Sequence, residues 1–388
     1  MNNLLLMLIL LLMMSSMLRI DIGVTALSLY MPIVLFTWIV FLKYIKFNKM
    51  YSFEIVFVLL YMYIVFSSLW SIDYALSLKL ILGEIVLLLS YFILRYLSST
   101  ETLENFEKIF LHIAKFFTIV SLILYIYGIV WYYVLEFIPS EGMYLNESSI
   151  GILGLYLEGF MPRFRGLSES PNNYFYIEFL VTVFLLYKSQ IKFAIISIST
   201  LILTVSSTGA LVLISVILFT LFNKKYIMKL IPLVVIVILS GFILYLNNEF
   251  IYHLLNYRFD RIMTGSGRIE LWLYLLDYIN ESPLFGYGAN TSRIILENLR
   301  GYQSAHNSFL DILLTTGVIG LLILLSFFIL LLLISLKLSL QYNTNMFIYL
   351  WISYFIISMS NNTLHIVYTI LYMFFLYIYY NKLQKGFQ

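Results

Sequence analysis

The sequence has no cysteine and few charged residues. None of the 388 residues is cysteine, which excludes disulfides, zinc–thiolate sites and iron–sulfur clusters. Charged residues make up 11% of the chain, whereas an average soluble domain has roughly 25%. The formal net charge of +3 is too small to indicate nucleic-acid binding. The composition therefore argues against a soluble domain and against a nucleic-acid partner.

Hydrophobic residues make up most of the remaining composition. They make up 62% of the chain, and the mean hydropathy is +0.95. Apolar runs of about 20 residues recur, each long enough to cross a bilayer, whereas a β-barrel would show short alternating strands. We predict an all-α integral membrane protein, a single polytopic domain over residues 1–388. We expect about twelve spans, at 4–18, 24–42, 54–70, 78–97, 109–135, 172–187, 191–205, 208–222, 228–246, 307–336, 346–360 and 363–380.

Lysine and arginine are distributed differently between the two predicted sides. The loops on one side contain nearly all the lysines, which the positive-inside rule makes cytoplasmic, so both termini are expected inside. The opposite side has arginine and almost no lysine. Arginine binds phosphate well because its planar guanidinium donates two hydrogen bonds and stays charged. Alternatively, these arginines are incidental, because long outer loops translocate regardless of charge.

Two predicted outer loops are long, at residues 136–171 and 247–306. The second contains five arginines, a helix-like segment at 267–280, and His306 at its end. We therefore predict that a membrane scaffold presents this loop to a lipid-linked anionic substrate. The inner loops have no Walker A run, which argues against an ATP-driven pump.

Several motifs recur in a recognisable order. They are SSLWSIDYALSLKL (67–80), RFRGLSESPNNYFY (163–176), SSTGALVLISVIL (206–218), GRIELWLYLLDYINESPLFGYGANT (267–291) and HNSFLDILLTTGVIGLL (306–322). In order and spacing they resemble the O-antigen ligase and O-antigen polymerase family of bacterial envelope glycosyltransferases. The resemblance extends over roughly residues 60–335.

The resemblance implies a metal-independent enzyme without a cofactor in the bacterial cytoplasmic (inner) membrane, with an extracytoplasmic active site. Family members take a glycan from undecaprenyl diphosphate. The resemblance matches His306 to the catalytic histidine, and Arg268 and Arg165 to diphosphate-binding arginines, with Arg163 a close competitor of Arg165. One departure is Ser206–Gly209, which lacks the arginine that many members have there.

Elementary chemistry independently favours the same residue types. A sugar hydroxyl needs a base near neutral pH, and histidine is the common choice. Arginines can stabilise a departing diphosphate without a metal. His306 precedes a predicted helix, whose dipole favours the neutral imidazole. Arg293 and Arg300 could bind phosphate or lipid head groups. Alternatively, His306 and Arg268 are interfacial structural residues.

Other polar residues compete for a functional role. His365 is either a polar bundle residue or a contact behind the site. We expect His253 to be interfacial, and His112 lies on the predicted cytoplasmic side. Glu84 and Glu178 fall in or near spans, where carboxylates are functional by default and suit a proton-coupled transporter.

We therefore predict an inverting polysaccharide repeat-unit polymerase that joins undecaprenyl-diphosphate-linked oligosaccharides outside the cytoplasm. His306 is its predicted base, and Arg165, Arg268, Arg163 and Arg293 are its predicted diphosphate ligands. A flippase, a chain-length regulator and membrane lipids are candidate partners. The alternatives are an O-antigen ligase that transfers glycan to lipid A core, and a transporter or flippase for the same lipid-linked sugar.

Overall fold

The structure of the protein is a computed structural model. The structure describes residues 2–21, 26–43, 50–99, 101–136, 144–146, 149–158, 161–221, 256, 268–297 and 304–386. The α-helices are α1 (Asn2–Met14), α2 (Tyr30–Phe41), α3 (Ser52–Ser67), α4 (Tyr74–Ser98), α5 (Leu103–Ile129), α6 (Pro171–Tyr187), α7 (Ile191–Leu203), α8 (Ser207–Leu221), α11 (Arg268–Glu281), α12 (Thr291–Glu297), α13 (Ser308–Gln341), α14 (Met346–Ser360) and α15 (Val367–Gly386). A 3₁₀ turn (Ser68–Trp70) follows α3, and a π-helical turn (Val130–Val134) follows α5. The strands are β1 (Arg19–Asp21), β2 (Ala26–Ser28), β3 (Tyr144–Asn146), β4 (Ser149–Ile152), β5 (Leu155–Glu158) and β6 (Met161–Phe164).

The apolar runs form helices, as predicted. Helices α1 to α8 and α13 to α15 coincide with predicted spans, and the predicted span at 228–246 lies outside the described residues. By length and composition, four helices in the described ranges could cross a membrane: Ser52–Trp70, Ser77–Ser98, Leu103–Val134 and Ser308–Gln341. Shorter apolar helices accompany them. The chain is thus a multi-pass helical membrane protein, and the number twelve stays a prediction.

Some predicted boundaries differ from the observed ones. The span predicted at 24–42 begins with strand β2, which pairs with β1, and only then continues as helix α2. Polar Arg19 and Asp21 lie in this hairpin, which interrupts the apolar pattern. The predicted last span at 363–380 starts later, because α15 begins at Val367. His365 therefore lies in the loop between α14 and α15.

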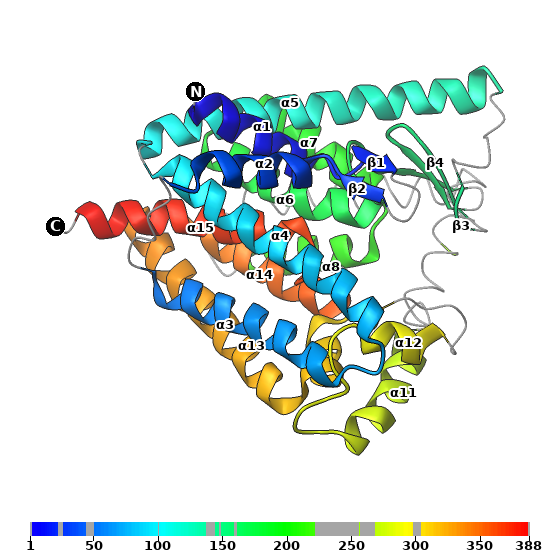
Figure 1. Cartoon of the computed structure of the whole chain (residues 1–388). Coiled ribbons are helices and arrows are strands. Elements are labelled where there is room, and N and C mark those ends of the chain that lie inside the picture. The colour runs from blue at the N-terminus through cyan, green and yellow to red at the C-terminus, as the bar shows by residue number, and fades with distance from the viewer. Residues whose placement is uncertain are drawn as a thin grey trace.

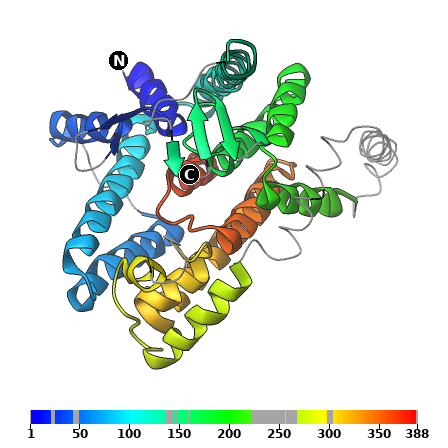
Figure 2. The same ribbon diagram turned by 90° about the vertical axis from the view of Figure 1, so that its right-hand side faces the viewer.

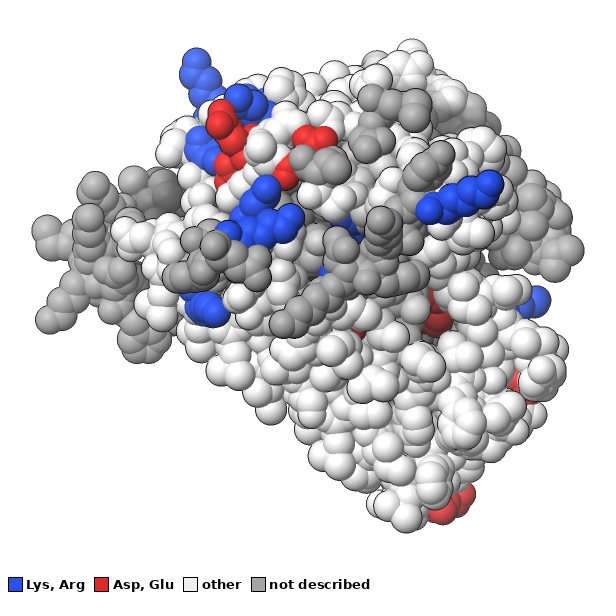
Figure 3. Space-filling model, turned by 60° about the vertical axis from the view of Figure 1, so that its left-hand side comes forward, with Lys and Arg blue, Asp and Glu red and all other residues white. Residues whose placement is uncertain are grey.

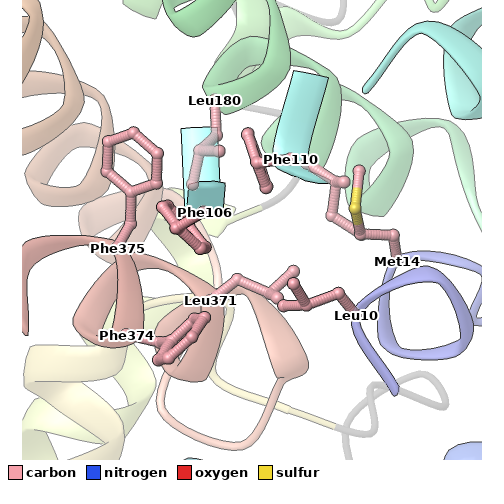
Figure 4. Close-up of a pocket in the computed structure, with 9 residues that line it drawn as sticks. Leu10, Met14, Phe106, Phe110, Leu180, Leu371, Phe374 and Phe375 are labelled. Atoms are coloured by element: carbon pink, nitrogen blue, oxygen red, sulfur yellow. The ribbon is translucent and has the colours of Figure 1, made fainter. Parts of the chain in front are cut away.

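Helix α15 lies at the centre of the bundle. It contacts α1, α4, α5, α6, α13 and α14, and its residues from Tyr368 to Tyr379 are buried. Figure 1 shows this helix in red crossing the middle of the molecule, and Figure 2 shows the other helices around it. Figure 4 shows where α15 meets α1, α5 and α6, around a gap of about 10 Å³ lined only by apolar side chains. This gap belongs to the packed core and offers no group for substrate chemistry.

Buried charges in the bundle are paired. The Arg95 Nε lies 2.8 Å from the Glu54 carboxylate, which also accepts a 2.7 Å hydrogen bond from the Tyr91 hydroxyl. The Lys188 ammonium lies 2.6 Å from Glu107. Isolated charges are costly in hydrocarbon, so such pairs fix which helix faces meet. On the surface, charged side chains gather over one part of the face in Figure 3, and most of the rest is uncharged.

The loop predicted at 136–171 contains a small sheet. Strands β3 to β6 form a four-stranded antiparallel meander in sequential order. Its inner residues Leu155, Leu157 and Phe164 join the main hydrophobic core. The sheet is therefore anchored on the helices, and it leads directly from β6 into α6. That 136–171 and 247–306 are extracytoplasmic loops stays a prediction.

Helix α13 is broken where a loop packs against it. Gly317 has φ +67° and ψ −167°, and a Cβ built there would lie 2.1 Å from the Leu284 carbonyl oxygen. The loop backbone pairs with the helix through Tyr287 N to Leu314 O at 2.9 Å and Val318 N to Pro283 O at 2.8 Å. Gly317 therefore admits this loop against the helix.

We predict opposite effects on stability for two glycine-to-alanine changes. Gly317→Ala should destabilise the fold by about 2 kcal/mol or more, because alanine disfavours positive φ and its Cβ meets backbone. Gly83→Ala is the control: Gly83 lies inside α4 with nothing within 4 Å of a built Cβ. Alanine there should stabilise by about 0.5–1 kcal/mol. Melting temperatures of the detergent-purified variants measure both, and equal melting temperatures would contradict the break.

Candidate active site

His306 lies at the junction between the long loop and α13. Its φ of +49° is in the left-handed region, which is uncommon for a residue with a Cβ. On one side, the Trp272 indole of α11 donates a 2.9 Å hydrogen bond to the carbonyl of Ala305. On the other, the Asn307 carboxamide caps α13 by accepting from the Phe309 and Leu310 amides. Structure on both sides therefore holds the strained backbone in place.

The loop after α14 packs against the start of α13. The Ser308 hydroxyl donates to the Asn361 carbonyl at 2.9 Å and accepts from the Thr363 amide at 2.9 Å. This places the Asn361 side chain within hydrogen-bonding reach of His306. The same side chain donates to the Tyr176 hydroxyl of α6. Asn361 thus links the predicted base to the second motif of the resemblance.

Arg268, the first residue of α11, belongs to the same cluster. Its Nη1 donates a 2.9 Å hydrogen bond to the carbonyl of Ser360 at the end of α14. Its positive charge acts on both His306 and the Tyr176 hydroxyl. Residues far apart in sequence are therefore gathered into one cluster, formed by Arg268, His306, Asn361 and Tyr176.

Arg163 approaches this cluster from the sheet. It is 7% exposed, its Nη1 lies 2.7 Å from Glu158, and its Nε donates to the carbonyl of Thr204 at 2.9 Å. Its charge also acts on the Tyr176 hydroxyl. Because Glu158 of β5 and Thr204 at the end of α7 hold it, the guanidinium has a fixed direction. The positive charges of Arg163 and Arg268 therefore both act on the Tyr176 hydroxyl.

Arg165 lies against the sheet itself. Its Nε donates to the Leu153 carbonyl at 2.8 Å, and its guanidinium covers Gly151. Burial lowers the pKa of Arg165 to about 10, with Tyr156 and Glu169 opposing this, so the side chain is charged at neutral pH. These contacts tie Arg165 to the turn between β4 and β5. The geometry thus favours Arg163, the close competitor, as the arginine that acts with Arg268.

The remaining predicted residues lie elsewhere. Arg293 is a partly buried residue of α12, and it stays a candidate. Arg300 and His253 lie outside the described residues. His112 is exposed on α5, next to the carbonyl of Lys108. Within the described part of the chain, no group of three or more His, Cys, Asp or Glu side chains is arranged to hold a metal ion.

The environment of His306 suits a base. Burial of the ring and the charge of Arg268 lower the pKa of His306, while the hydrogen bond with Asn361 opposes this. The imidazole is therefore neutral at neutral pH and can accept a proton. Nearby cationic guanidiniums can stabilise negative charge that develops on a leaving group.

His365 lies in a different environment. Its Nδ1 is paired with the Glu84 carboxylate of α4, and its Nε2 lies 3.6 Å from Asp311 of α13. Burial works against the charged ring, but the two carboxylates outweigh it and raise the pKa of His365 to about 10. His365 is therefore protonated at neutral pH and cannot act as a base there. Glu178, in contrast, accepts a 2.7 Å hydrogen bond from Thr118 and ties α6 to α5.

Sequence reasoning missed Tyr176 and Asn361. Tyr176 ends the motif RFRGLSESPNNYFY, yet one tyrosine among 33 carries no distinguishing signal. Asn361 stands in the polar run Ser360–Thr363 between two apolar runs, which was a usable signal. In a chain with few polar side chains, such a run marks a place where polar groups meet.

Comparison with known proteins identifies a similar family and one relative. Residues 193–325 match the model of the family described as O-Antigen ligase. A stretch of 100 residues is 36% identical to the ComP-specific O-oligosaccharyltransferase of Acinetobacter baylyi (strain ATCC 33305 / BD413 / ADP1). That match spans 24% of this chain and 18% of the relative. Together, the matches confirm that this multi-pass helical membrane protein resembles the O-antigen ligase and Wzy-like family.

We predict that Arg268→Gln raises the pKa of His306. Glutamine can still donate to the Ser360 carbonyl, but it removes the positive charge that disfavours the imidazolium. NMR titration of the four histidines measures this directly. For any activity that needs neutral His306, the acidic limb of the pH–activity profile should then shift to higher pH. Arg19→Gln, which removes an exposed arginine paired with Glu169, is the control. An unchanged His306 titration in Arg268→Gln would contradict the cluster.

Proposed function

We propose that the protein is a glycosyltransferase that moves a glycan from a lipid-linked diphosphate to an acceptor hydroxyl. The observation that carries this proposal is the contact of His306 with Asn361 and the charge of Arg268. A neutral base and fixed cations are the two components that transfer from a sugar diphosphate requires. The family description names O-antigen ligation and the relative's name describes oligosaccharide transfer, and both support a glycan-transferring enzyme.

In the proposed reaction, the acceptor hydroxyl oxygen attacks the anomeric carbon and its proton passes to His306. The bond between that carbon and the diphosphate oxygen breaks, and the electron pair leaves with the diphosphate. Arg268 and Arg163 would stabilise the charge that develops there, since both are held in fixed directions. A single displacement of this kind inverts the anomeric configuration.

The acceptor defines the finer function. We propose undecaprenyl-diphosphate-linked oligosaccharides as donors and, for a repeat-unit polymerase, also as acceptors. The matched family and relative support a ligase at least equally, because their names describe a ligase and an oligosaccharyltransferase. A transporter would place functional charge along the spans. Glu84 and Glu178, the carboxylates considered for that role, instead contact neighbouring elements of the bundle. The two carboxylates therefore fit a structural role in the bundle better than a role in a transport pathway.

The test is glycan formation in cells whose only copy of the gene carries His306→Ala. Loss of a base should reduce transfer about 10²–10⁴-fold, so unprocessed lipid-linked units should accumulate. His112→Ala, on the exposed face of α5, should leave glycan formation unchanged. Membrane abundance of both variants must equal that of the wild type.

The product identifies the acceptor. Long glycan that disappears in His306→Ala, leaving single repeat units on the acceptor, indicates a polymerase. Loss of all glycan from the final acceptor, with normal polymer on the carrier, indicates a ligase. Normal glycan in His306→Ala at normal abundance would refute the assignment of His306 as the base.

A further inference from the structure

A cavity with several polar lining residues lies next to Asn362, the neighbour of Asn361 of the cluster. Its volume is about 290 Å³, near the lower end of small-ligand pockets. Residues from α3, α4, α12, α13 and the loop after α14 line it. They include Ser292, Ser304, Asp311, Thr315, Asn362 and His365. Neither Arg163 nor Arg268 is among the lining residues.

The lining combines hydrogen-bond donors and acceptors. Ser292, Ser304 and Thr315 contribute hydroxyls, and Asp311, Asn362 and His365 contribute a carboxylate, a carboxamide and an imidazole. Asp311 is 3% exposed, and one of its oxygens accepts a 2.8 Å hydrogen bond from the Asn362 amide. A ligand rich in hydrogen-bonding groups therefore suits this wall.

The charge of the wall selects the chemistry of that ligand. His365 is the cation among the lining residues, and its charge is matched by Asp311 of the wall and by Glu84, which does not line the cavity, so no unbalanced cation is there to hold a diphosphate. A lipid chain would offer the polar side chains of the wall no hydrogen bond. An uncharged, hydroxyl-rich molecule satisfies both conditions, because each hydroxyl can donate to a carboxylate or amide oxygen.

The position of the cavity indicates which substrate it serves. Ser304 of the wall lies two residues before His306, and Asp311 lies in the first turn of the helix that follows. Asn361 faces Tyr176 and His306, whereas its neighbour Asn362 faces Asp311. Cationic groups thus gather on one side of the asparagine pair and anionic groups on the other. A sugar in the cavity would lie near the base and away from the arginines.

We propose that the cavity lined by Asp311, Asn362 and Ser292 binds a sugar residue of the acceptor glycan through its hydroxyl groups. The role of the sugar as an acceptor rests on the proposed glycosyl transfer. The binding of a neutral sugar in the cavity does not depend on that function. Asp311 and Asn362 are binding residues here, and His306 remains the base.

Two variants of the full-length purified protein test this. Ser292→Leu fills the cavity with hydrocarbon, and Asp311→Asn removes its charge at nearly constant volume. The matched controls are Ser326→Leu on the exposed face of α13 and Asp277→Asn on the exposed face of α11. The probe is the lipid-free oligosaccharide released by mild acid from the cell's own glycan. Calorimetry gives its Kd, and transfer assays give separate KM values for donor and acceptor.

We expect each cavity variant to weaken oligosaccharide binding and raise the acceptor KM at least tenfold, with the donor KM within about twofold. The controls should match the wild type. Binding to Ser292→Leu as tight as to wild type, or no binding to wild type, would overturn the proposal and leave a water-filled structural cavity. If Asp311→Asn does not fold, Ser292→Leu decides. Wild-type binding without transfer would refute the proposed function alone, whereas transfer with an unchanged acceptor KM would refute the cavity alone.

Discussion

The hydrogen bonds of Ser308 hold the candidate site together. This hydroxyl joins the first turn of α13 to the loop after α14 by accepting from Thr363 and donating to Asn361. It thereby fixes His306, two residues earlier, beside the Asn361 side chain. The arginine at the start of α11 bonds to the same loop through Ser360. This junction therefore fixes the positions of the start of α11, the start of α13 and the loop after α14 relative to one another.

The surrounding bundle follows the same physical rule. Two buried carboxylates of the bundle pair with a cation on a different element, Glu54 with Arg95 and Glu107 with Lys188. Such pairs add little net stability, because desolvation offsets attraction. They do specify which helix faces meet.

Much of the scaffold could be predicted from the sequence. Long apolar runs specify helices in any membrane protein, and they located α3, α4, α5 and α13 closely. The sequence also assigned His306 and Arg268 to one site, and the structure brings the charge of Arg268 to bear on His306, while their catalytic roles stay a prediction. The choice between Arg163 and Arg165 was not predictable, because two residues spaced by two are equivalent in an alternating strand pattern. Only tertiary contacts separate them: Arg163 contacts Glu158 and Thr204, whereas Arg165 follows β6 and bonds to Leu153.

Other features depended on tertiary contacts. Gly317 looks like a helix-packing glycine in sequence, and only the backbone of Leu284 beside it explains its left-handed φ. The ion-paired state of His365 requires Glu84, which is 281 residues away. Helical or strand periodicity reports only on residues close in sequence, so it cannot identify such a partner. Residues that function through distant neighbours are therefore the ones that local reasoning misses.

The left-handed backbone of His306 has a consequence for protein engineering. Conformational strain of this kind costs stability that a different side chain need not lose. Asparagine occupies the same backbone region far more readily than most residues. Asparagine at position 306 would therefore keep the backbone conformation while removing the imidazole, so the backbone strain and the proposed chemistry of His306 are separable.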